Sequence, residues 1–263
     1  MIAGRIESVL ILSTIGLQET AIPERSTMPR SRVSDSQYKR QGVKLSSIVD
    51  AAIDLLDEGG MAAMTMRGVA ARLGVSTSTV YWHAGNKEEL QAAVCEALLG
   101  DLALPPFDSS ATWDLWLRTA AAALRAEVRK HPNAVPLLDS LQIRPGSLEF
   151  MEGTLGALHA AGISSQNLVF AYNAVVGFLF GWVFSEFAPV PEDAPDGWEA
   201  ELEKSVRSVS EVEFPLIHRY SSNLVNRSFL ARWNNGAVEP LDESFEMALD
   251  ILVAGLGRLA HSG

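Results

Sequence analysis

Apolar residues recur along most of this chain at the three- and four-residue intervals of amphipathic helices. Gly59-Gly60 marks the end of the first helix, whose apolar face is made of Ile48, Ala51, Ala52, Leu55 and Leu56. Further helices are expected over residues 86–104, 111–130, 145–161, 164–188, 197–212 and 241–260. No segment shows a convincing two-residue alternation between hairpin turns, so the fold class is predicted to be all-α.

Prolines separate the helical pattern into two domains. None occurs between Arg30 and Leu104, and Pro105-Pro106 closes that segment. Because proline disrupts helix interiors, residues 41–104 are expected to form an N-terminal helical domain with a connecting helix. Residues 105–263 are expected to form a larger C-terminal helical domain.

Residues 1–40 show no sustained period and are polar after Thr20, so a disordered N-terminal extension is expected. Met28 stands just before a basic segment. Translation therefore either begins at Met28 or includes residues 1–27 as a genuine leader. Residues 8–17 are only weakly similar to a signal-peptide core, and no clear cleavage site follows them.

The composition is that of a globular protein with a substantial core. Of 263 residues, 48% are hydrophobic and 20% are charged, which excludes a wholly disordered chain. Cys95 is the only cysteine, which excludes an internal disulfide framework and a cysteine-rich zinc site and favours a reducing, cytoplasmic location. Asn173 and Glu186 interrupt the longest apolar stretch, and no run reaches the roughly 18–20 residues of a membrane helix, so no membrane partner is expected.

The formal net charge of −11 conceals an uneven distribution of charge. Residues 65–87 contain three basic side chains, Arg67, Arg72 and Lys87, and no acidic one, whereas residues 105–263 contain 20 acidic and 11 basic residues. Salt screens charges beyond about 8–10 Å. A basic N-terminal surface on an acidic body is therefore compatible with binding to nucleic acid.

Residues 64–90 carry the pattern of a helix-turn-helix, in the sequence MTMRGVAARLGVSTSTVYWHAGNKEEL. Ala70 is small where two helices would cross, and Gly74 supplies the positive φ of a tight turn. Val80 would face inward, and Ser76 is a good N-cap for the second helix, whose first turn would meet the major groove of DNA. A helical hairpin with a glycine turn and no DNA-binding role is the alternative interpretation.

The polar residues of the second helix favour the DNA-binding interpretation. Thr77, Ser78 and Thr79 are expected to be exposed beside Tyr81 and His83. Hydroxyl groups and aromatic rings of this kind contact phosphates, base edges and thymine methyl groups.

This segment, preceded by the stretch IVDAAIDLLDEGG, resembles the DNA-binding domain of the TetR family of transcriptional repressors over about residues 43–100. The run YWH followed by NK is similar to the tetracycline-repressor branch. The resemblance implies that Arg67 and the second helix contact base edges. It implies a DNA-binding set of Thr65, Arg67, Ser76, Thr77, Ser78, Thr79, Tyr81, His83 and Lys87. Trp82 is expected to lie in the core, and His83 could simply end its helix.

The C-terminal half resembles the ligand-binding domain of the same family more loosely. The resemblance covers GTLGALHAAGISSQNLVFAYNAVVGFLFGWVFSEF and FEMALDILVAGLGRL, which fit helices that form a four-helix dimer bundle in this family. It implies a homodimer interface at Gly177, Gly181, Phe245, Leu249, Leu252, Leu256 and Leu259. The last five have the spacing of a helix–helix seam, and packing within one chain is the alternative.

The drug-binding residues of the tetracycline repressor are not retained. When the two sequences are aligned without gaps from Trp113, the drug-contacting asparagine of that repressor aligns with Ala120. Its magnesium-binding histidine aligns with Leu138. Both positions are apolar, so neither tetracycline nor a metal is predicted, and no cofactor is implied. A cavity for a hydrophobic or aromatic effector is expected instead. Its candidate lining, for which ordinary core packing is the alternative, is Trp116, Leu117, Leu124, His131, Phe150, Phe170, Asn173 and Phe178.

The expected function is that of a ligand-responsive transcriptional regulator, a homodimeric repressor that leaves a palindromic operator when a small effector binds. An activator or a corepressor-dependent regulator of the same fold is the first alternative, since the sign of regulation depends on operator position. A helical small-molecule-binding protein or enzyme that has lost DNA binding is the second. No glycine-rich phosphate loop, nucleophile elbow or metal-ligand spacing supports an enzyme.

Overall fold

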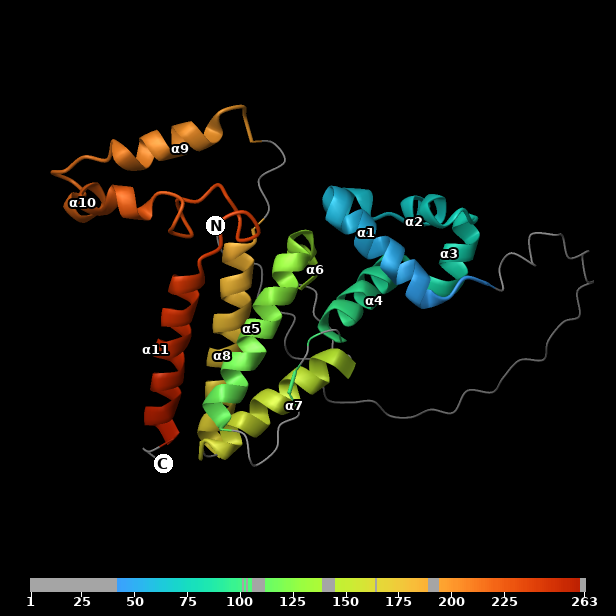
Figure 1. Ribbon diagram of the computed structural model, residues 1–263, viewed down its shortest axis with the longest axis horizontal. Coiled ribbons are helices and arrows are strands. Elements are labelled where there is room, and N and C mark those ends of the chain that lie inside the picture. Colours follow the sequence, from blue (N-terminus) through green and yellow to red (C-terminus); the bar gives the residue numbers. More distant parts are fainter. Residues whose placement is uncertain are drawn as a thin grey trace, which may run out of the picture. The chain divides into compact units, whose positions relative to one another are not determined.

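The computed structural model describes residues 42–100, 102, 104–105, 112–138, 145–163, 165–188 and 194–260. Every regular element among these residues is helical, which confirms the all-α expectation (Figure 1). The expectations for residues 1–40, including the possible start at Met28, fall outside the described residues.

The N-terminal domain contains α1 (Leu45–Ala63), α2 (Met66–Leu73), α3 (Thr77–Ala84) and α4 (Lys87–Gly100). The regular geometry of α1 ends at the expected glycine pair, because Gly59 and Gly60 leave the helical region and Gly60 has a φ of 66°. α4 ends at Gly100 rather than at the expected Leu104.

The predicted apolar face of α1 forms the core of this domain. Ile48, Ala52 and Leu56 are fully enclosed, and α1 contacts α2, α3 and α4. Val69 of α2 and Val80 of α3 are enclosed with them. Burial of one aliphatic side chain contributes roughly 1.5–3 kcal/mol, so these residues hold the three short helices in place.

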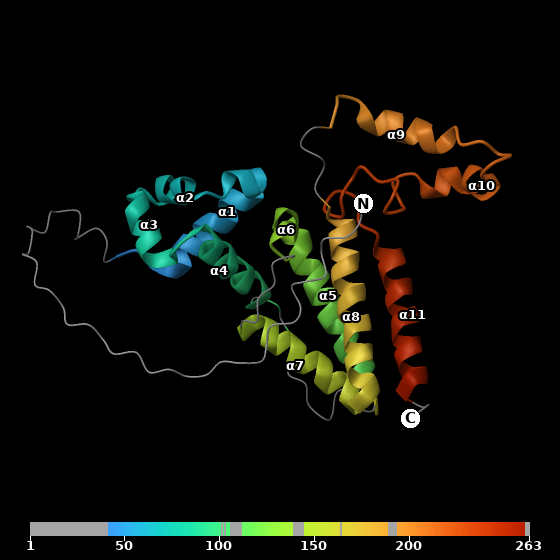
Figure 2. The ribbon, with the colours of Figure 1, turned by 180° about the vertical axis from the view of Figure 1, so that it is seen from behind.

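The C-terminal domain contains α5 (Trp113–Lys130), η3 (Pro132–Ala134), α6 (Val135–Leu138), α7 (Pro145–Ala160), α8 (Ser165–Glu186), α9 (Trp198–Arg207), α10 (Pro215–Leu224) and α11 (Asp242–Ala260). α5, α8 and α11 run along one another in both views (Figures 1 and 2). α8 contacts α5, α7 and α11, and α7 also contacts α4.

The sequence pattern does not predict η3, α6 or α10, because the prolines in these segments read as interruptions. Pro132 and Pro215 instead occupy the first turns of η3 and α10. A proline at the start of a helix forfeits no hydrogen bond, since the first N–H groups have no partner within the helix.

A buried ion pair joins α5 to the end of α8. Glu186 is 0% exposed and accepts hydrogen bonds from Arg125 Nε (2.7 Å) and Nη2 (2.6 Å). It also accepts from Trp182 Nε1 (2.8 Å) and from the main-chain N–H of Leu241 (2.9 Å). Burial alone would raise the pKa of Glu186, but these hydrogen bonds and the Arg125 charge hold it below its ordinary value. Glu186 therefore ties the start of α11 to α8.

α8 has an exposed apolar side. An 18-residue window within Gln166–Glu186 has a mean hydropathy of 1.8, and the segment is long and apolar enough to cross a membrane, so the expectation that no run is long enough was wrong. Helices inside soluble proteins also meet this criterion, and the other side of α8 packs against α5, α7 and α11. The exposed apolar face of α8 and α11 consists of Val169, Phe170, Ala174, Gly177, Gly181, Met247, Ile251 and Ala254.

α9 and α10 contact each other but contain no buried residue. The segment that joins them and α10 itself expose the large apolar side chains of Val212, Phe214, Leu216, Ile217 and Tyr220.

Candidate nucleic-acid interface and ligand-binding region

The turn between α2 and α3 has the geometry expected of a helix-turn-helix. Gly74 lies in the left-handed region, with φ 64° and ψ 31°, and its N–H donates back to the end of α2. The N–H of Val75 donates to the carbonyl of Ala70 at 3.0 Å, and Ala70 is buried. The predicted roles of Ala70 and Gly74 are confirmed.

Side chains cap all three helices at this surface. Thr65 Oγ1 accepts from the N–H of Gly68 (3.0 Å) at the start of α2, and Ser76 Oγ accepts from the N–H of Thr79 (3.2 Å) at the start of α3. At the start of α4, Asn86 Oδ1 accepts from the N–H of Glu89 (2.8 Å), while Asn86 Nδ2 donates to the Glu89 carboxylate (3.1 Å). Each cap satisfies N–H groups that a helix start otherwise leaves without a partner.

The polar residues of α3 divide into exposed and buried positions. Ser78 and Tyr81 are exposed, and Thr77 is partly exposed. The expectation that Thr79 is exposed was wrong: its side chain is 4% exposed, and its hydroxyl lies 2.8 Å from Ser76 Oγ. Thr79 follows Ser76 by three residues, so its side chain turns back toward the cap.

Trp82 was expected in the core, but its side chain is 74% exposed. Val80 and Ala84 face inward, so Trp82, midway between them on a helix of 3.6 residues per turn, faces outward. Its ring meets His83 edge to face, with 4.5 Å between ring centroids. His83 Nε2 is buried without a hydrogen-bond partner. Helical phase, rather than hydrophobicity, would have identified Trp82 as a surface residue.

The three basic residues of this segment are not equivalent. Arg67 and Lys87 are exposed in the first turns of α2 and α4. Arg72 instead faces α1, where it donates to the Glu58 carboxylate. Its Nη1 lies 3.6 Å from Asp54 Oδ2. The hydrogen bond to Glu58 raises the pKa of Arg72 above its ordinary value. The charge of Arg72 is therefore offset within the domain, and Arg67 and Lys87 carry the basic character of the surface.

The candidate effector residues do not all face one cavity. Trp116, Leu117, Leu124 and Phe150 are buried, and Trp116 Nε1 donates to the carbonyl of Pro105 (2.8 Å). Phe178 is partly buried and stacks on Phe245, with ring centroids 6.0 Å apart.

Phe170 and Asn173 were placed wrongly in the cavity. Phe170 is 65% exposed and Asn173 is exposed, both on the outer side of α8. The predominantly apolar sequence of α8 gives no clear helical phase from which the inner side could be identified.

A small apolar cavity of about 20 Å³ lies between α4, α5 and the residues that follow α5. That volume is about enough for one water molecule. Ala120 and Leu138, the two positions compared above with drug-binding residues of the tetracycline repressor, are both buried and apolar. The cavity is lined by Leu98, Leu99, Leu102, Leu124, Glu127, Val128, His131, Ala134 and Leu138.

His131 is a link between the domains rather than only a cavity residue. Its Nδ1 lies 2.8 Å from Asp57 Oδ2 of α1, and its Nε2 lies 3.6 Å from Glu127. Asn133 Nδ2 donates to the carbonyls of Leu56 (3.0 Å) and Asp57 (3.2 Å). These bonds satisfy carbonyl groups near the end of α1, so η3 acts as a cap for that helix.

The predicted dimer residues fall on two sides of their helices. Gly177 and Gly181 are exposed, and a Cβ atom added at either would meet no atom within 4 Å. Phe245, Leu249 and Leu256 are buried within one chain, as the alternative interpretation held. The remaining members of the predicted stripe are the partly buried Leu252 and Leu259.

Among the residues that the structure describes, no group of three or more His, Cys, Asp or Glu side chains could hold a metal ion.

The fold and the α2–α3 surface define a helix-turn-helix protein with a second, helical domain. Residues 48–94 match the family described as bacterial regulatory proteins, tetR family, and residues 105–259 match the tetracyclin repressor-like C-terminal domain. The chain belongs to the TetR family.

An HTH-type transcriptional regulator of Saccharopolyspora erythraea is 31% identical over 140 residues, which are 53% of this chain and 59% of that protein. The structure of Streptomyces coelicolor ActR in complex with actinorhodin has a TM-score of 0.66 and 21% identity, covering 83% of this chain and 98% of ActR. BioQ of Mycobacterium smegmatis, bound to its double-stranded DNA operator, has a TM-score of 0.54 and 21% identity, covering 82% of this chain and 99% of BioQ. At these identities the two structures establish similarity of fold.

Proposed function

We propose that this chain is a cytoplasmic, DNA-binding transcriptional repressor that acts as a homodimer on a palindromic operator and is released by a small effector. The observation that carries the proposal is the capped helix α3, which presents Ser78, Tyr81 and Trp82 to solvent beside Arg67 and Lys87. The operator bound to BioQ supports the proposed DNA binding, and the actinorhodin bound to ActR supports the proposed binding of a small effector.

The proposed DNA contacts combine side chains with helix starts. Arg67 and Lys87 lie in the first turns of α2 and α4, and Ser78 lies in the first turn of α3. Helix N-termini carry partial positive charge and attract phosphate. We assign phosphate contacts to Thr65, Tyr81 and Lys87, and base contacts to Arg67 and the exposed side of α3.

The set of DNA contacts differs from the sequence prediction at two residues. Trp82 is added because its ring is exposed, and Thr79 is left out because its side chain is buried against Ser76. Ser76, Thr77 and His83 remain in the set as residues that border this surface.

The proposed dimer joins two copies through the exposed apolar face of α8 and α11. Large apolar side chains such as Phe170, Met247 and Ile251 are more than half exposed there, and removing them from water stabilises a complex. Gly177 and Gly181 leave room for the close approach of another helix. Two recognition helices related by a twofold axis would read a palindrome with half-sites about 34–36 Å apart.

The proposed effector is a hydrophobic or aromatic molecule that enters between α4 and α5. The small cavity there is lined by Leu98 and Leu99 of α4 and by Leu124 and Val128 of α5. Because α4 also contacts α1 and α3, an effector that widens this cavity would move the DNA-binding helices. By linkage, operator binding would weaken effector binding by the same factor.

Titration of a labelled random-sequence duplex with the full chain tests DNA binding directly. We expect affinity to fall steeply with salt, with a logarithmic slope of about −0.9 per phosphate contact. A Lys87→Gln variant with unchanged circular dichroism should show a shallower slope. Absence of binding even at low salt would favour a helical small-molecule-binding protein that has lost DNA binding.

A further inference from the structure

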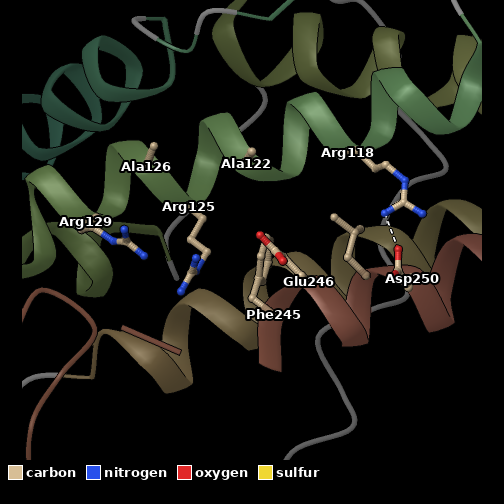
Figure 3. Close-up of a pocket in the computed structure, with 9 residues that line it drawn as sticks. Arg118, Ala122, Arg125, Ala126, Arg129, Phe245, Glu246 and Asp250 are labelled. Carbon is tan, nitrogen blue, oxygen red and sulfur yellow. Dashed lines mark hydrogen bonds and ion pairs between the residues drawn. The ribbon is translucent and has the colours of Figure 1, made fainter. Parts of the chain in front are cut away.

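A groove of about 420 Å³ lies between α5 and α11 (Figure 3). It uses the side of α5 that carries Arg118, Ala122 and Ala126, whereas Leu124 and Val128 of the same helix face the small interior cavity. The groove is therefore separate from the proposed effector cavity. Its volume lies within the range of small-molecule sites. Its lining consists of Arg118, Ala122, Arg125, Ala126, Arg129, Phe245, Glu246, Leu249 and Asp250.

Three arginines line the α5 side of the groove, at positions separated by seven and four residues, so they share one helix face. Arg125, in the middle, donates from each of its three side-chain nitrogens to Glu186 or Asp242, and its guanidinium lies 4.6 Å from the centre of the Phe245 ring. Arg125 is therefore part of the scaffold rather than a free donor.

The two outer arginines hold the ends of the groove, about 16 Å apart at 1.5 Å per residue. Arg118 Nη1 lies 2.5 Å from Asp250, and Arg129 Nη2 lies 2.6 Å from Asp242. Arg129 Nε is buried and has no hydrogen-bond partner, but the side chain as a whole is 37% exposed. Because a guanidinium carries five N–H donors and Asp242 takes one at Nη2, the exposed part of Arg129 can still donate to a ligand in the groove.

The middle of the groove is apolar. Ala122 and Ala126 leave its α5 wall open, and Phe245 and Leu249 form the opposite wall. Figure 3 shows Arg118, Arg125 and Arg129 projecting from α5 toward α11, with Glu246 between Arg125 and Arg118. Glu246 would repel a second negative charge near the centre, so the groove favours a ligand with one anionic end.

We propose that this groove binds an organic monoanion, a carboxylate whose oxygen accepts from the exposed part of the Arg129 guanidinium and whose aromatic or aliphatic body lies across Ala122 and Ala126. Guanidinium groups recognise carboxylates with strong, directional hydrogen bonds. Asp242 stays bonded to Arg129 Nη2 and Arg125, which keeps the Arg129 guanidinium fixed for the ligand.

Isothermal titration of the full chain with 2-naphthoate tests the site, and the neutral isostere 2-naphthamide is the matched ligand control. We expect one saturable naphthoate site per chain and at least about tenfold weaker binding of the amide, the loss of about one charged hydrogen bond. The measurement uses no DNA, so its result is independent of the proposed repressor function.

Two variants locate the site. Ala122→Phe fills the groove from an exposed position, and Arg129→Gln removes the charged guanidinium; each should weaken naphthoate binding about tenfold or more without altering the fold by circular dichroism. Arg219→Gln, an equal charge change at an exposed position of α10, should leave binding unchanged. No saturable binding, equal affinity for the amide, or naphthoate binding that survives Ala122→Phe would each overturn the proposal.

Discussion

His131, which follows the last residue of α5, lies 2.8 Å from the Asp57 carboxylate of α1. Two residues later, Asn133 donates to the last regular carbonyls of α1. His131 therefore lines the apolar cavity, and both His131 and Asn133 contact the DNA-binding domain. We expect a change at α5 to reach α1 through these contacts.

Removing the Asn133 amide should loosen the end of α1. Asn133→Ala loses two hydrogen bonds of about 1 kcal/mol each, so amide hydrogens in the second half of α1 should exchange about fivefold or more faster. Native-state hydrogen exchange followed by mass spectrometry measures this change. Asn223→Ala, at an exposed position of α10, is the control. Unchanged exchange in α1 would show that this contact does not stabilise the helix.

Arg67 and Arg72 should respond differently to the same substitution. Arg67→Gln should cost roughly 1–3 kcal/mol of specific DNA affinity if Arg67 reads a base edge. Arg72→Gln should leave DNA affinity nearly unchanged, because Glu58 and Asp54 already offset the charge of Arg72. Fluorescence anisotropy with a specific and a random duplex compares them. An equal loss on both duplexes for Arg67→Gln would contradict the base-reading role.

Trp82 should matter for DNA binding and little for folding. Because the ring is mostly exposed, Trp82→Ala should change the free energy of unfolding by less than about 1 kcal/mol while weakening DNA binding. Urea unfolding and anisotropy on the same preparations measure both. A large loss of stability with DNA affinity intact would show that the ring serves packing instead.

The dimer should depend on the outer side of α11. Ile251 is 68% exposed, so Ile251→Asp adds a charge to the proposed interface without burying it in the monomer. Light scattering should show a monomer at concentrations where the unmodified chain is a dimer. Leu148→Asp, at an exposed apolar position of α7, is the control and should remain dimeric. A dimeric Ile251→Asp protein would place the interface elsewhere.

Acid should weaken the buried ion pair in a defined direction. The folded-state pKa values of Glu186 and Asp242 lie below their ordinary values of 4.5 and 3.8. The stability these carboxylates contribute is therefore fully present above the unfolded-state pKa values and is lost as pH falls through the lower folded-state values. When melting temperatures are measured from pH 6 downward, they should begin to decrease once the pH is below about 4.5.

The Glu186→Gln variant separates this pair from the other carboxylates. It should be destabilised by about 3–5 kcal/mol at neutral pH, because it leaves the buried Arg125 without its main partner. Its melting temperature should decline less steeply with acid than that of the unmodified chain. Parallel acid curves for the two proteins would mean that Glu186 is not a stabilising carboxylate.

Local chemistry made much of the fold predictable. Gly59-Gly60 ends α1, Gly74 forms the turn and Ser76 caps α3, because each depends on residues within one or two turns of chain. The Arg125–Glu186 pair was not predictable, since its partners are separated by 61 residues and only packing brings them together.

The errors at the candidate sites have a common cause. Trp82 and Phe170 are large and apolar, but helical phase places both outside, and Thr79 is polar but lies on the buried side of α3. Residue type alone misassigned all three. In α8 the phase itself was hidden, because most of its positions, and above all those between Leu168 and Phe184, are apolar.

Selection of bound sequences from a random duplex pool, with the full chain at about 150 mM salt to suppress non-specific binding, tests whether this protein is a dimeric, sequence-specific regulator. We expect an enriched palindrome whose half-sites lie about one helical turn apart, and loss of that enrichment for Arg67→Gln but not for Arg72→Gln. An enriched site without twofold symmetry, or no enrichment by a well-folded protein, would show that the chain does not bind a palindromic operator as a dimer.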